Sequence, residues 1–310
     1  MHRAYRQYKA AAAGRAGPWE DERQGRPLRA LVLSAGGTFG AYHAGAWQAL
    51  EEAGFRPDIV AGASVGALEA ALIARGCTAA QLSAWWRDPR WNVFRWNWPP
   101  RVWGLLDPRR LEKRVTELCE RFSKPLPGVK LLVTLTELPG AKICVKADEE
   151  VTAPCLLASC AIPLFYPPVK IDGRWYCDGG VFCRLPLGAA AAAGAAEIVA
   201  IDLLAAPPSR VLRAALGAAC AVREAAIRQR DVSQIANPGV RVLRIEPSRP
   251  LGRPRDMLRW NPGQINQWIE AGYRDAVRWL DRERASQAKH AQPINPRAES
   301  SAPIKTERGR

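Results

Sequence analysis

Short apolar runs alternate along this chain with longer stretches whose apolar residues recur at helical spacing. The runs predict strands at residues 30–33, 59–61, 130–136, 141–145, 198–203 and 240–245, with a hairpin at 169–177. The longer stretches predict helices at residues 40–53, 65–75, 108–122, 153–161, 187–195, 209–234 and 262–284. This alternation predicts an α/β fold in which helices cover both faces of a mostly parallel sheet.

The chain of 310 residues is 48% hydrophobic, enough to bury one large core. Residues 1–27 are polar, Ala-rich and basic, and we expect a flexible segment or a surface helix there. The core is expected over 28–205, with 206–284 as a C-terminal helical part of the same domain. Residues 285–310 are polar and rich in Pro, Ser and Lys, which predicts disorder.

Apolar segments long enough to cross a bilayer, about 18 residues or more, are absent from the sequence. The chain begins Met1-His-Arg-Ala-Tyr-Arg, without the apolar region of a signal peptide. The sequence therefore predicts a cytoplasmic protein.

Basic residues outnumber acidic ones, and the formal net charge is +15. Such a surface attracts nucleic acid or anionic lipid. The sequence has no recognition-helix, zinc-finger or RNP-like pattern, so we expect no nucleic acid partner. The 3 histidines and 8 cysteines lack metal-ligand spacing, which predicts no metal site and no cofactor. We interpret the cysteines as reduced small hydrophobes.

Residues 85–106 have the most unusual local composition, because arginines alternate there with half of the chain's 12 tryptophans. One hypothesis is a lid or docking surface for an anionic membrane, since tryptophan favours the headgroup level of bilayers. The alternative is an excursion that covers the core, with rings packed inward and arginines stacked on them. The tryptophans concerned are Trp85, Trp86, Trp91, Trp96, Trp98 and Trp103.

Candidate chemistry begins with the pentad Gly62-Ala-Ser-Val-Gly66, which lies between a predicted strand and a predicted helix. That context holds the Ser64 hydroxyl exposed on a sharp turn, as a nucleophile requires. The pentad alone is weak evidence for a nucleophile, because an ordinary tight turn with Ser64 as a helix N-cap has the same sequence.

A second glycine turn precedes it, in Ser34-Ala-Gly-Gly-Thr-Phe-Gly40. Its amides, at Gly36, Gly37 and Thr38, would stand at the start of a helix, where an oxyanion finds pre-aimed donors. A rival is a dinucleotide fingerprint, for which the acidic residue would be Glu51, Glu52 or Asp58. That rival explains nothing about Ser64 and lacks its first glycine.

A serine nucleophile needs a base, and the histidine count points away from the usual one. His2 and His290 lie in segments that look like tails, and His43 lies one turn into a predicted helix. A carboxylate is therefore the expected base. Asp178, at the end of a predicted strand and followed by Gly179 and Gly180, is the best placed.

In combination, the motifs over residues 29–203 resemble the patatin-like phospholipase family. They are Leu33-Ser-Ala-Gly-Gly-Thr-Phe-Gly-Ala-Tyr-His-Ala-Gly45, Gly62-Ala-Ser-Val-Gly66, Ala158-Ser-Cys-Ala-Ile-Pro163, Phe165-Tyr-Pro-Pro-Val169 and Asp178-Gly-Gly-Val181. The resemblance implies a three-layer α/β/α fold and hydrolysis of glycerolipid acyl esters. By position it implies Ser64 as nucleophile, Asp178 as proton acceptor and the Gly36–Gly37 amides as oxyanion hole, with Gly40, Gly62, Gly66, Gly179 and Gly180 supporting the turns.

Three positions depart from the family pattern. Ala35 replaces a glycine, which the turn tolerates if φ is negative there. Phe39 stands where many members carry an arginine, which suggests a substrate other than an ordinary phospholipid. Arg184 replaces a frequent asparagine and is expected to alter the loop that supports Asp178. An acyltransferase with the same dyad, a catalytically silent lipid-binding module and a nucleotide-binding protein stay as alternatives.

Overall fold

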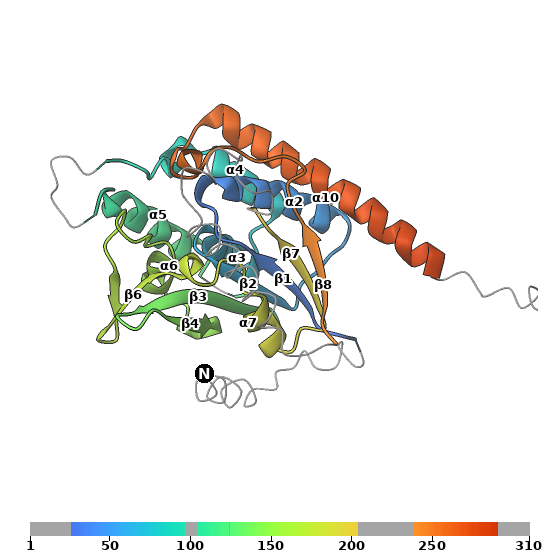
Figure 1. Cartoon of the computed structure of the whole chain (residues 1–310), viewed down its shortest axis with the longest axis horizontal. Coiled ribbons are helices and arrows are strands. Elements are labelled where there is room, and N and C mark those ends of the chain that lie inside the picture. The colour runs from blue at the N-terminus through green and yellow to red at the C-terminus, as the bar shows by residue number, and fades with distance from the viewer. Residues whose placement is uncertain (1–25, 97–103, 124, 204–238, 291–310) are drawn as a thin grey trace, which may run out of the picture.

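A computed structural model describes residues 26–96, 104–123, 125–203 and 239–290 (Figure 1). Its described part is built on one eight-stranded sheet with the order β5-β6-β3-β2-β1-β7-β8, while β4 pairs with β3. The strands are β1 (Arg29–Leu33), β2 (Ile59–Ala63), β3 (Lys130–Leu138), β4 (Lys142–Ala147), β5 (Val169–Ile171), β6 (Arg174–Asp178), β7 (Glu197–Ile201) and β8 (Arg241–Ile245).

The centre of the sheet is parallel, since β3, β2, β1, β7 and β8 pair in the same direction, and β4, β5 and β6 add antiparallel pairs at one side. Central strands such as β2 are buried along their whole length. This matches their continuous apolar sequence, which is typical of strands covered on both faces. The prediction of a mostly parallel α/β sheet is confirmed.

Helices connect these strands in the predicted alternation. The described helices are α2 (Ala41–Glu52), α3 (Val65–Ala74), α4 (Ala79–Arg87), α5 (Pro108–Arg121), α6 (Ala153–Ser159), α7 (Leu187–Ala192) and α10 (Pro262–His290). Single turns of 3-10 helix are η2 (Gly37–Gly40), η3 (Pro89–Trp91), η4 (Asp148–Glu150), η5 (Gly179–Val181) and η6 (Pro254–Leu258). None of the helices in the described ranges has the length and apolar character needed to cross a bilayer.

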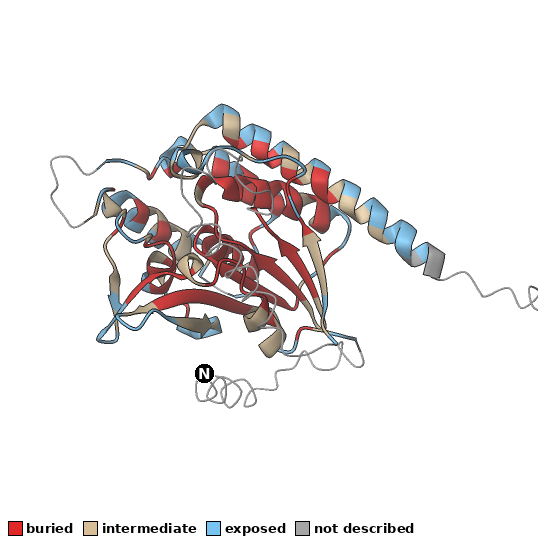
Figure 2. Ribbon diagram, viewed as in Figure 1, coloured by how far each residue is buried: buried red, intermediate tan, exposed pale blue. Residues whose placement is uncertain are grey.

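Alternate residues of each central strand face two separate cores. Leu31 and Leu33 of β1 join the larger core, which the buried sides of α2 to α6 and α10 complete. Ala30 and Val32 face the smaller core, which includes Leu187 and Ala190 of α7. Figure 2 shows the resulting buried strands between helices, as expected for three layers.

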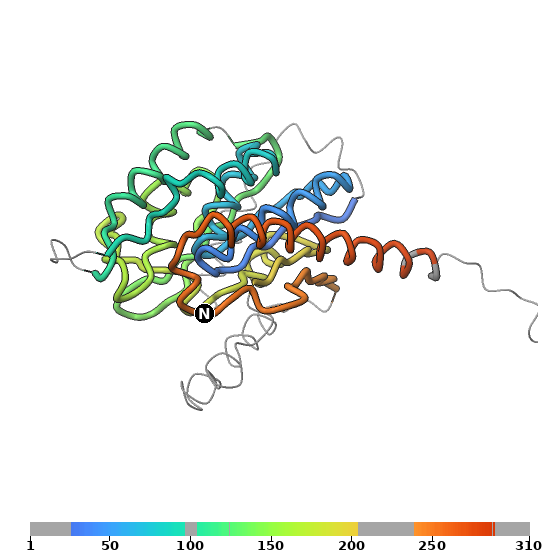
Figure 3. The backbone as a smooth tube through the Cα atoms, turned by 90° about the horizontal axis from the view of Figure 1, so that it is seen from above, coloured from blue at the N-terminus to red at the C-terminus, as the bar shows by residue number. Residues whose placement is uncertain are grey.

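The helices α2 and α10 cross at close range over the sheet (Figure 3). A Cβ placed on Gly45 of α2 would lie 1.8 Å from the carbonyl oxygen of Ile269, and one on Gly272 of α10 would lie 2.0 Å from that of Tyr42. Only glycine allows backbones to approach so closely. These two glycines therefore fix α10 against the helix that follows the first glycine turn.

The strand β3 has three partners, and their register brings two strand ends together. β2 pairs with the first half of β3 and β6 with the second half, while β4 overlaps both. Because β4 occupies one edge, β2 and β6 must share the other edge and run toward each other. Ala63 of β2 is opposite Thr134, and Asp178 of β6 is opposite the next residue, Leu135.

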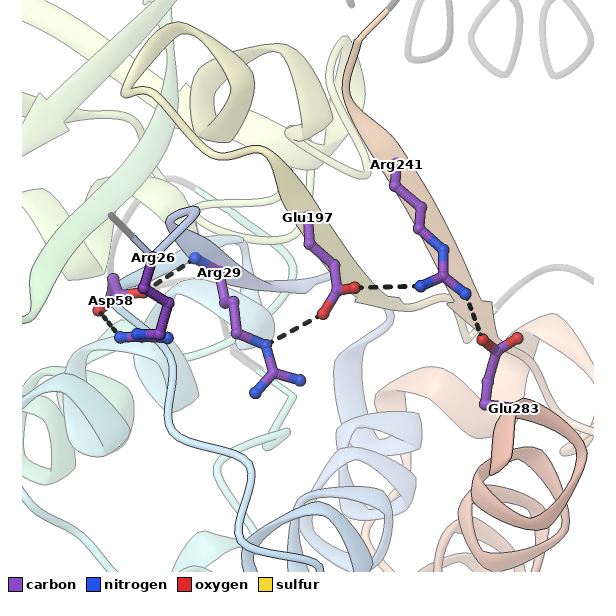
Figure 4. A network of polar contacts seen from close by, with 6 residues as sticks. All are labelled: Arg26, Arg29, Asp58, Glu197, Arg241 and Glu283. Atoms are coloured by element: carbon purple, nitrogen blue, oxygen red, sulfur yellow. Dashed lines mark hydrogen bonds and ion pairs between the residues drawn. The ribbon is translucent and has the colours of Figure 1, made fainter. Parts of the chain in front are cut away.

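A chain of ion pairs and hydrogen bonds joins the N-terminal ends of the parallel strands (Figure 4). The Arg29 Nε donates to Glu197 Oε1 (3.0 Å), and Arg241 joins Glu197 to Glu283 of α10. Asp58, just before β2, accepts from the Arg29 amide (2.9 Å) and from Arg26 (2.7 Å). This network ties the starts of β1, β7 and β8 together, away from the strand ends where the glycine turns lie.

The predicted elements differ from the structure at α10 and α4, and some predicted segments lie outside the described residues. The α10 helix continues past the predicted boundary at Ala285 to His290, since Ala, Gln and Lys extend a formed helix at little cost. The α4 helix was not predicted. The expected helix at 209–234, nearly all of the N-terminal segment 1–27 and the tail beyond 290 lie outside the described residues.

Candidate active site

Ser64 lies at the junction of β2 and α3 with φ 55° and ψ −128°. A non-glycine residue rarely adopts this region, and such strain is typical of functional turns. The turn is tight because a Cβ on Gly62 would lie 2.1 Å from the Gly66 carbonyl oxygen. A Cβ on Gly66 would lie 2.5 Å from that of Leu33, so the glycines also press α3 against the end of β1.

Ser159, at the end of α6, holds this turn from behind. Its hydroxyl accepts from the Ser64 amide (3.0 Å) and donates to the carbonyl oxygen of Thr134 (2.8 Å). Ser159 is fully buried, so neither bond competes with water. Ser159 lies within the motif Ala158-Ser-Cys-Ala-Ile-Pro163, but no role for it was predicted; the one signal for it in the sequence is a serine among apolar helix residues.

Asp178 lies directly against the serine, and the Ser64 hydroxyl donates to its Oδ2 (2.6 Å). The Gly180 amide donates to Oδ1 (2.6 Å), and the Thr136 hydroxyl donates to the Asp178 carbonyl oxygen (3.0 Å). Burial raises the pKa of Asp178 to about 7, although the bonds from Ser64 and Gly180 oppose the rise. A carboxylate tuned to neutral pH in contact with a hydroxyl has the properties of a general base.

The two glycines after Asp178 allow the three loops of the site to meet. A Cβ on Gly179 would lie 2.1 Å from the Thr134 carbonyl oxygen, and one on Gly180 would lie 2.4 Å from the Cβ of Ala35. The latter position is also 3.8 Å from the Cβ of Ser64. Gly180 therefore lies between the first glycine turn and the serine.

The first glycine turn presents its amides without internal partners in the described part of the chain. The amides of Gly36, Gly37 and Thr38 precede the first bond of the turn, which runs from the Phe39 amide to the Gly36 carbonyl. Gly37 has φ 57°, and a Cβ there would lie 2.2 Å from the Met257 carbonyl oxygen. The Thr38 hydroxyl donates to the Asp256 carbonyl (2.6 Å), so η6 fixes this loop from outside.

Two of the three departures are explained by packing around this loop. Ala35 has no positive φ, so its side chain causes no backbone strain. Phe39 is buried and packs edge-on against Trp268 of α10, with ring centroids 5.0 Å apart. A phenylalanine here anchors α10 over the turn.

The third departure, Arg184, supports the first glycine turn and takes part in a buried ion pair. Its guanidinium forms a two-point contact with Asp202, whose Oδ2 also accepts from Arg244 (3.2 Å). The Arg184 carbonyl accepts from the Ala35 amide (2.8 Å), and the Ser34 hydroxyl accepts from the Leu203 amide (3.0 Å). We expected Arg184 to alter the loop around Asp178; these contacts lead to the Ala35 loop.

The contacts of His43 are structural and do not include Ser64. Its Nδ1 lies 2.5 Å from Glu69 Oε2, and Trp86 donates to Glu69 Oε1 (2.7 Å). All three side chains are buried, and burial raises the pKa of Glu69. The His43 Nε2 has no hydrogen-bond partner in the described structure. The trio joins α2, α3 and α4 beneath the site.

The three acidic residues considered for the dinucleotide alternative have other partners in the structure. Asp58 precedes β2 at the far end of the sheet from the glycine turn, where it binds Arg26 and the Arg29 amide. Glu51 accepts from the Ala79 amide, and Glu52 accepts from Gln48 and Tyr273. None of the three carboxylates is placed to bind a ribose beside the first glycine turn.

The described tryptophans of residues 85–106 differ in burial: three pack on the core and one is exposed. Trp86 and Trp91 are buried, and half-buried Trp85 packs against both, so these three cover the core. Residues 85–87, the first part of the predicted lid-like segment 85–106, belong to α4, which packs on α2. Trp96 is 68% exposed, and Trp98 and Trp103 lie outside the described residues.

Two further features lie apart from the dyad. A cleft of about 800 Å³ between β8 and α10 is lined by Arg244, Asp275, Arg278 and neighbouring residues and contains neither Ser64 nor Asp178. Across the described ranges, no group of three His, Cys, Asp or Glu side chains is arranged to hold a metal ion.

A family model and one of the curated relatives below carry the same family name. A family model described as Patatin-like phospholipase matches residues 31–191, a span that includes Ser64 and Asp178. The uncharacterized protein YqhO of Bacillus subtilis is 29% identical over 187 residues, which cover 50% of this chain and 64% of that protein. Patatin-like phospholipase domain-containing protein 6 of Homo sapiens is 29% identical over 190 residues, 56% of this chain and 13% of that protein.

Among solved structures, VipD from Legionella pneumophila matches with a TM-score of 0.42 and 14% identity, covering 83% of this chain and 67% of that one. The chain spans less than two thirds of the length of either curated relative above.

Proposed function

This chain belongs to the patatin-like phospholipase family, and we propose that it is a serine acyl-ester hydrolase acting on glycerolipids through a Ser64–Asp178 dyad. The observation that carries the proposal is the 2.6 Å hydrogen bond from the Ser64 hydroxyl to a buried carboxylate. Asp178 needs no histidine in between, and His43, which is buried in the core, is bound to Glu69.

In the proposed reaction, Asp178 Oδ2 takes the Ser64 proton as Ser64 Oγ attacks the acyl carbonyl carbon. The amides of Gly36, Gly37 and Thr38 receive the oxyanion. Collapse of the tetrahedral intermediate expels the glycerolipid alcohol, which takes the proton from Asp178, and leaves the acyl group on Ser64. A water then attacks the acyl-enzyme, Asp178 takes its proton, and the second collapse returns the proton to Ser64 and releases the fatty acid.

Each part of this mechanism has a physical support in the site. The pKa of Asp178, near 7, lets the carboxylate accept and return a proton at neutral pH. Donors fixed by packing, such as the Gly37 amide beneath Met257, cost no reorganisation when negative charge develops. Removing one such donor typically costs on the order of a hundredfold in turnover.

Product analysis tests the proposal. The parent protein should release free fatty acid from phosphatidylcholine, lysophospholipid or monoacylglycerol, and Ser64→Ala should release none above background while unfolding at a similar temperature. Adding glycerol or lysophospholipid as acceptor distinguishes hydrolysis from acyl transfer, since a transferase yields acylated acceptor. Equal fatty-acid release by the parent and Ser64→Ala would refute the dyad.

A further inference from the structure

Three large apolar side chains stand out of the surface on adjoining segments. Trp96 is 68% exposed, Leu105 is 49% exposed and Leu164 is 70% exposed. We call these three residues the apolar patch. The segments are joined by the backbone, because Trp96 forms a β-bridge with Leu106, and the Leu105 amide donates to the Leu164 carbonyl (3.0 Å). The backbone segments that carry the three side chains are thus tied to one another.

Leu164 is held in an unusual conformation. Its φ is 73°, in the left-handed region that a leucine seldom adopts. The segment around it is fixed, since the Leu106 amide donates to the Phe165 carbonyl (2.8 Å), and a Cβ on Gly104 would lie 2.8 Å from the same oxygen. The fold thus keeps a strained leucine on the surface where it buries little.

The patch lies close to the catalytic carboxylate. The Asp178 amide donates to the carbonyl of Ala161 (3.0 Å), and Leu164 follows Ala161 by three residues. Three residues span at most roughly 11 Å. The α5 and β6 side of the molecule, which carries these segments, is opposite the free end of α10 (Figures 1 and 3).

Charge around the patch is positive. The nearby acids Asp88 and Asp107 are paired with Arg90 and Arg109. Exposed cations that form no ion pair within the described ranges remain at Arg95, Arg110 and Lys113, against the exposed acids Glu112 and Glu120 of α5. A tryptophan and two leucines beside unpaired basic side chains match the chemistry of an anionic lipid surface.

We propose that the apolar patch docks this protein on the surface of an anionic bilayer, with Trp96, Leu105 and Leu164 inserted at the headgroup level. The choice of lipid as the occupant rests on the proposed function, and docking here brings the membrane to the edge of the Ser64–Asp178 site. Trp86 and Trp91 take no part, because they are buried under the same segment.

Vesicle co-sedimentation tests this proposal without catalysis. The Ser64→Ala protein is mixed with vesicles of phosphatidylglycerol and phosphatidylcholine in equal parts, or of phosphatidylcholine alone. We expect tighter binding to the anionic vesicles and weaker binding in 1 M salt, where charges are screened. Adding Trp96→Ser, Leu105→Ser and Leu164→Ser should weaken binding by about tenfold or more, since three apolar side chains no longer enter the bilayer.

The matched control is Leu126→Ser in the same Ser64→Ala background. Leu126 is 44% exposed and lies at the far end of α3, where its amide binds the Ala74 carbonyl. Its replacement should leave vesicle binding within twofold. Circular dichroism melting establishes that the triple variant is folded.

Three outcomes would overturn the proposal: no binding of the Ser64→Ala protein to anionic vesicles, equal binding by the triple variant, or equal loss in Leu126→Ser. Loss of self-association in the triple variant with unchanged vesicle binding would assign the patch to a second copy of the chain. Fatty-acid release is measured separately, so failure of the hydrolase proposal does not affect this result.

Discussion

Ser64 and Asp178 meet because the strands that carry them run toward each other along one edge of β3. Ala63, before the serine, is opposite Thr134, and Asp178 is opposite the adjacent Leu135. The 2.6 Å contact between their side chains is therefore set by sheet register, and residues 114 positions apart become neighbours. A shift of one residue in either strand would separate them and turn the side chains to the other face.

The raised pKa of Asp178 predicts the pH dependence of the reaction. The base must be ionised to take the Ser64 proton, and its pKa is about 7. With a soluble monomeric ester, kcat/KM should rise about tenfold per pH unit below 7 and level off above it. A flat profile between pH 5 and 8 would mean that Asp178 keeps an ordinary carboxyl pKa or is not the base.

The same shift predicts that Asp178→Asn stabilises the fold while abolishing turnover. The folded-state pKa is above the unfolded value near 4, so the folded protein holds the proton more tightly. The parent thus loses stability as pH rises from about 4 to 7, and the neutral asparagine does not. At pH 8 the variant should gain up to about 4 kcal/mol in free energy of unfolding.

Urea unfolding at several pH values checks this gain. It should shrink as the pH falls toward 4, where the aspartate is protonated in both states. A variant that is less stable than the parent at pH 8 would contradict the assignment of a buried, costly carboxylate.

Ser159→Ala should weaken both the fold and the reaction. The change leaves the Ser64 amide and the Thr134 carbonyl without a partner in a buried position, which costs about 1–3 kcal/mol. Turnover should fall severalfold because the serine turn is less firmly held. Ser83→Ala is the control, since the buried Ser83 hydroxyl has no partner in the described structure; its replacement should be nearly neutral. Equal effects of both changes would remove the special role of Ser159.

The local pattern of apolar residues and glycines predicted the main strands and helices of the fold. The strand predicted at 59–61 and the helix predicted at 65–75 follow from apolar periodicity and glycine placement, and the structure has them as β2 (Ile59–Ala63) and α3 (Val65–Ala74). The α4 helix was not predicted, although a capping box between Thr78 and Gln81 marks its start. That box was readable in the sequence.

Other features could not be read from local pattern. The partners of Arg184 and Ser159 are Asp202 and Thr134, and only the sheet brings each pair together. The burial of Trp86 depends likewise on Glu69, which accepts from its indole (2.7 Å). Polar partners distant in sequence leave no periodic signal, so the supporting residues of the site stayed hidden while its glycines were visible.

Glu69→Ala should be far more destabilising than a loss in the strand-end network. The change leaves His43 Nδ1 and the Trp86 indole without their partner inside the core, at a cost of about 3 kcal/mol. Glu197→Ala removes two contacts at a half-exposed position and should cost about 1 kcal/mol or less. Thermal unfolding compares the two glutamates, and a larger loss from Glu197→Ala would contradict the buried trio as a structural anchor.

Labelling with a fluorophosphonate probe tests the Ser64–Asp178 dyad most directly, because the probe bonds only to an activated serine. After reaction with the parent protein, peptide mass spectrometry should find the adduct on Ser64 alone. Ser64→Ala should remain unlabelled, and Asp178→Asn should react at least a hundredfold more slowly, since general-base assistance is typically worth about that much. An unlabelled parent protein, or equal labelling of the Asp178→Asn variant, would contradict the dyad.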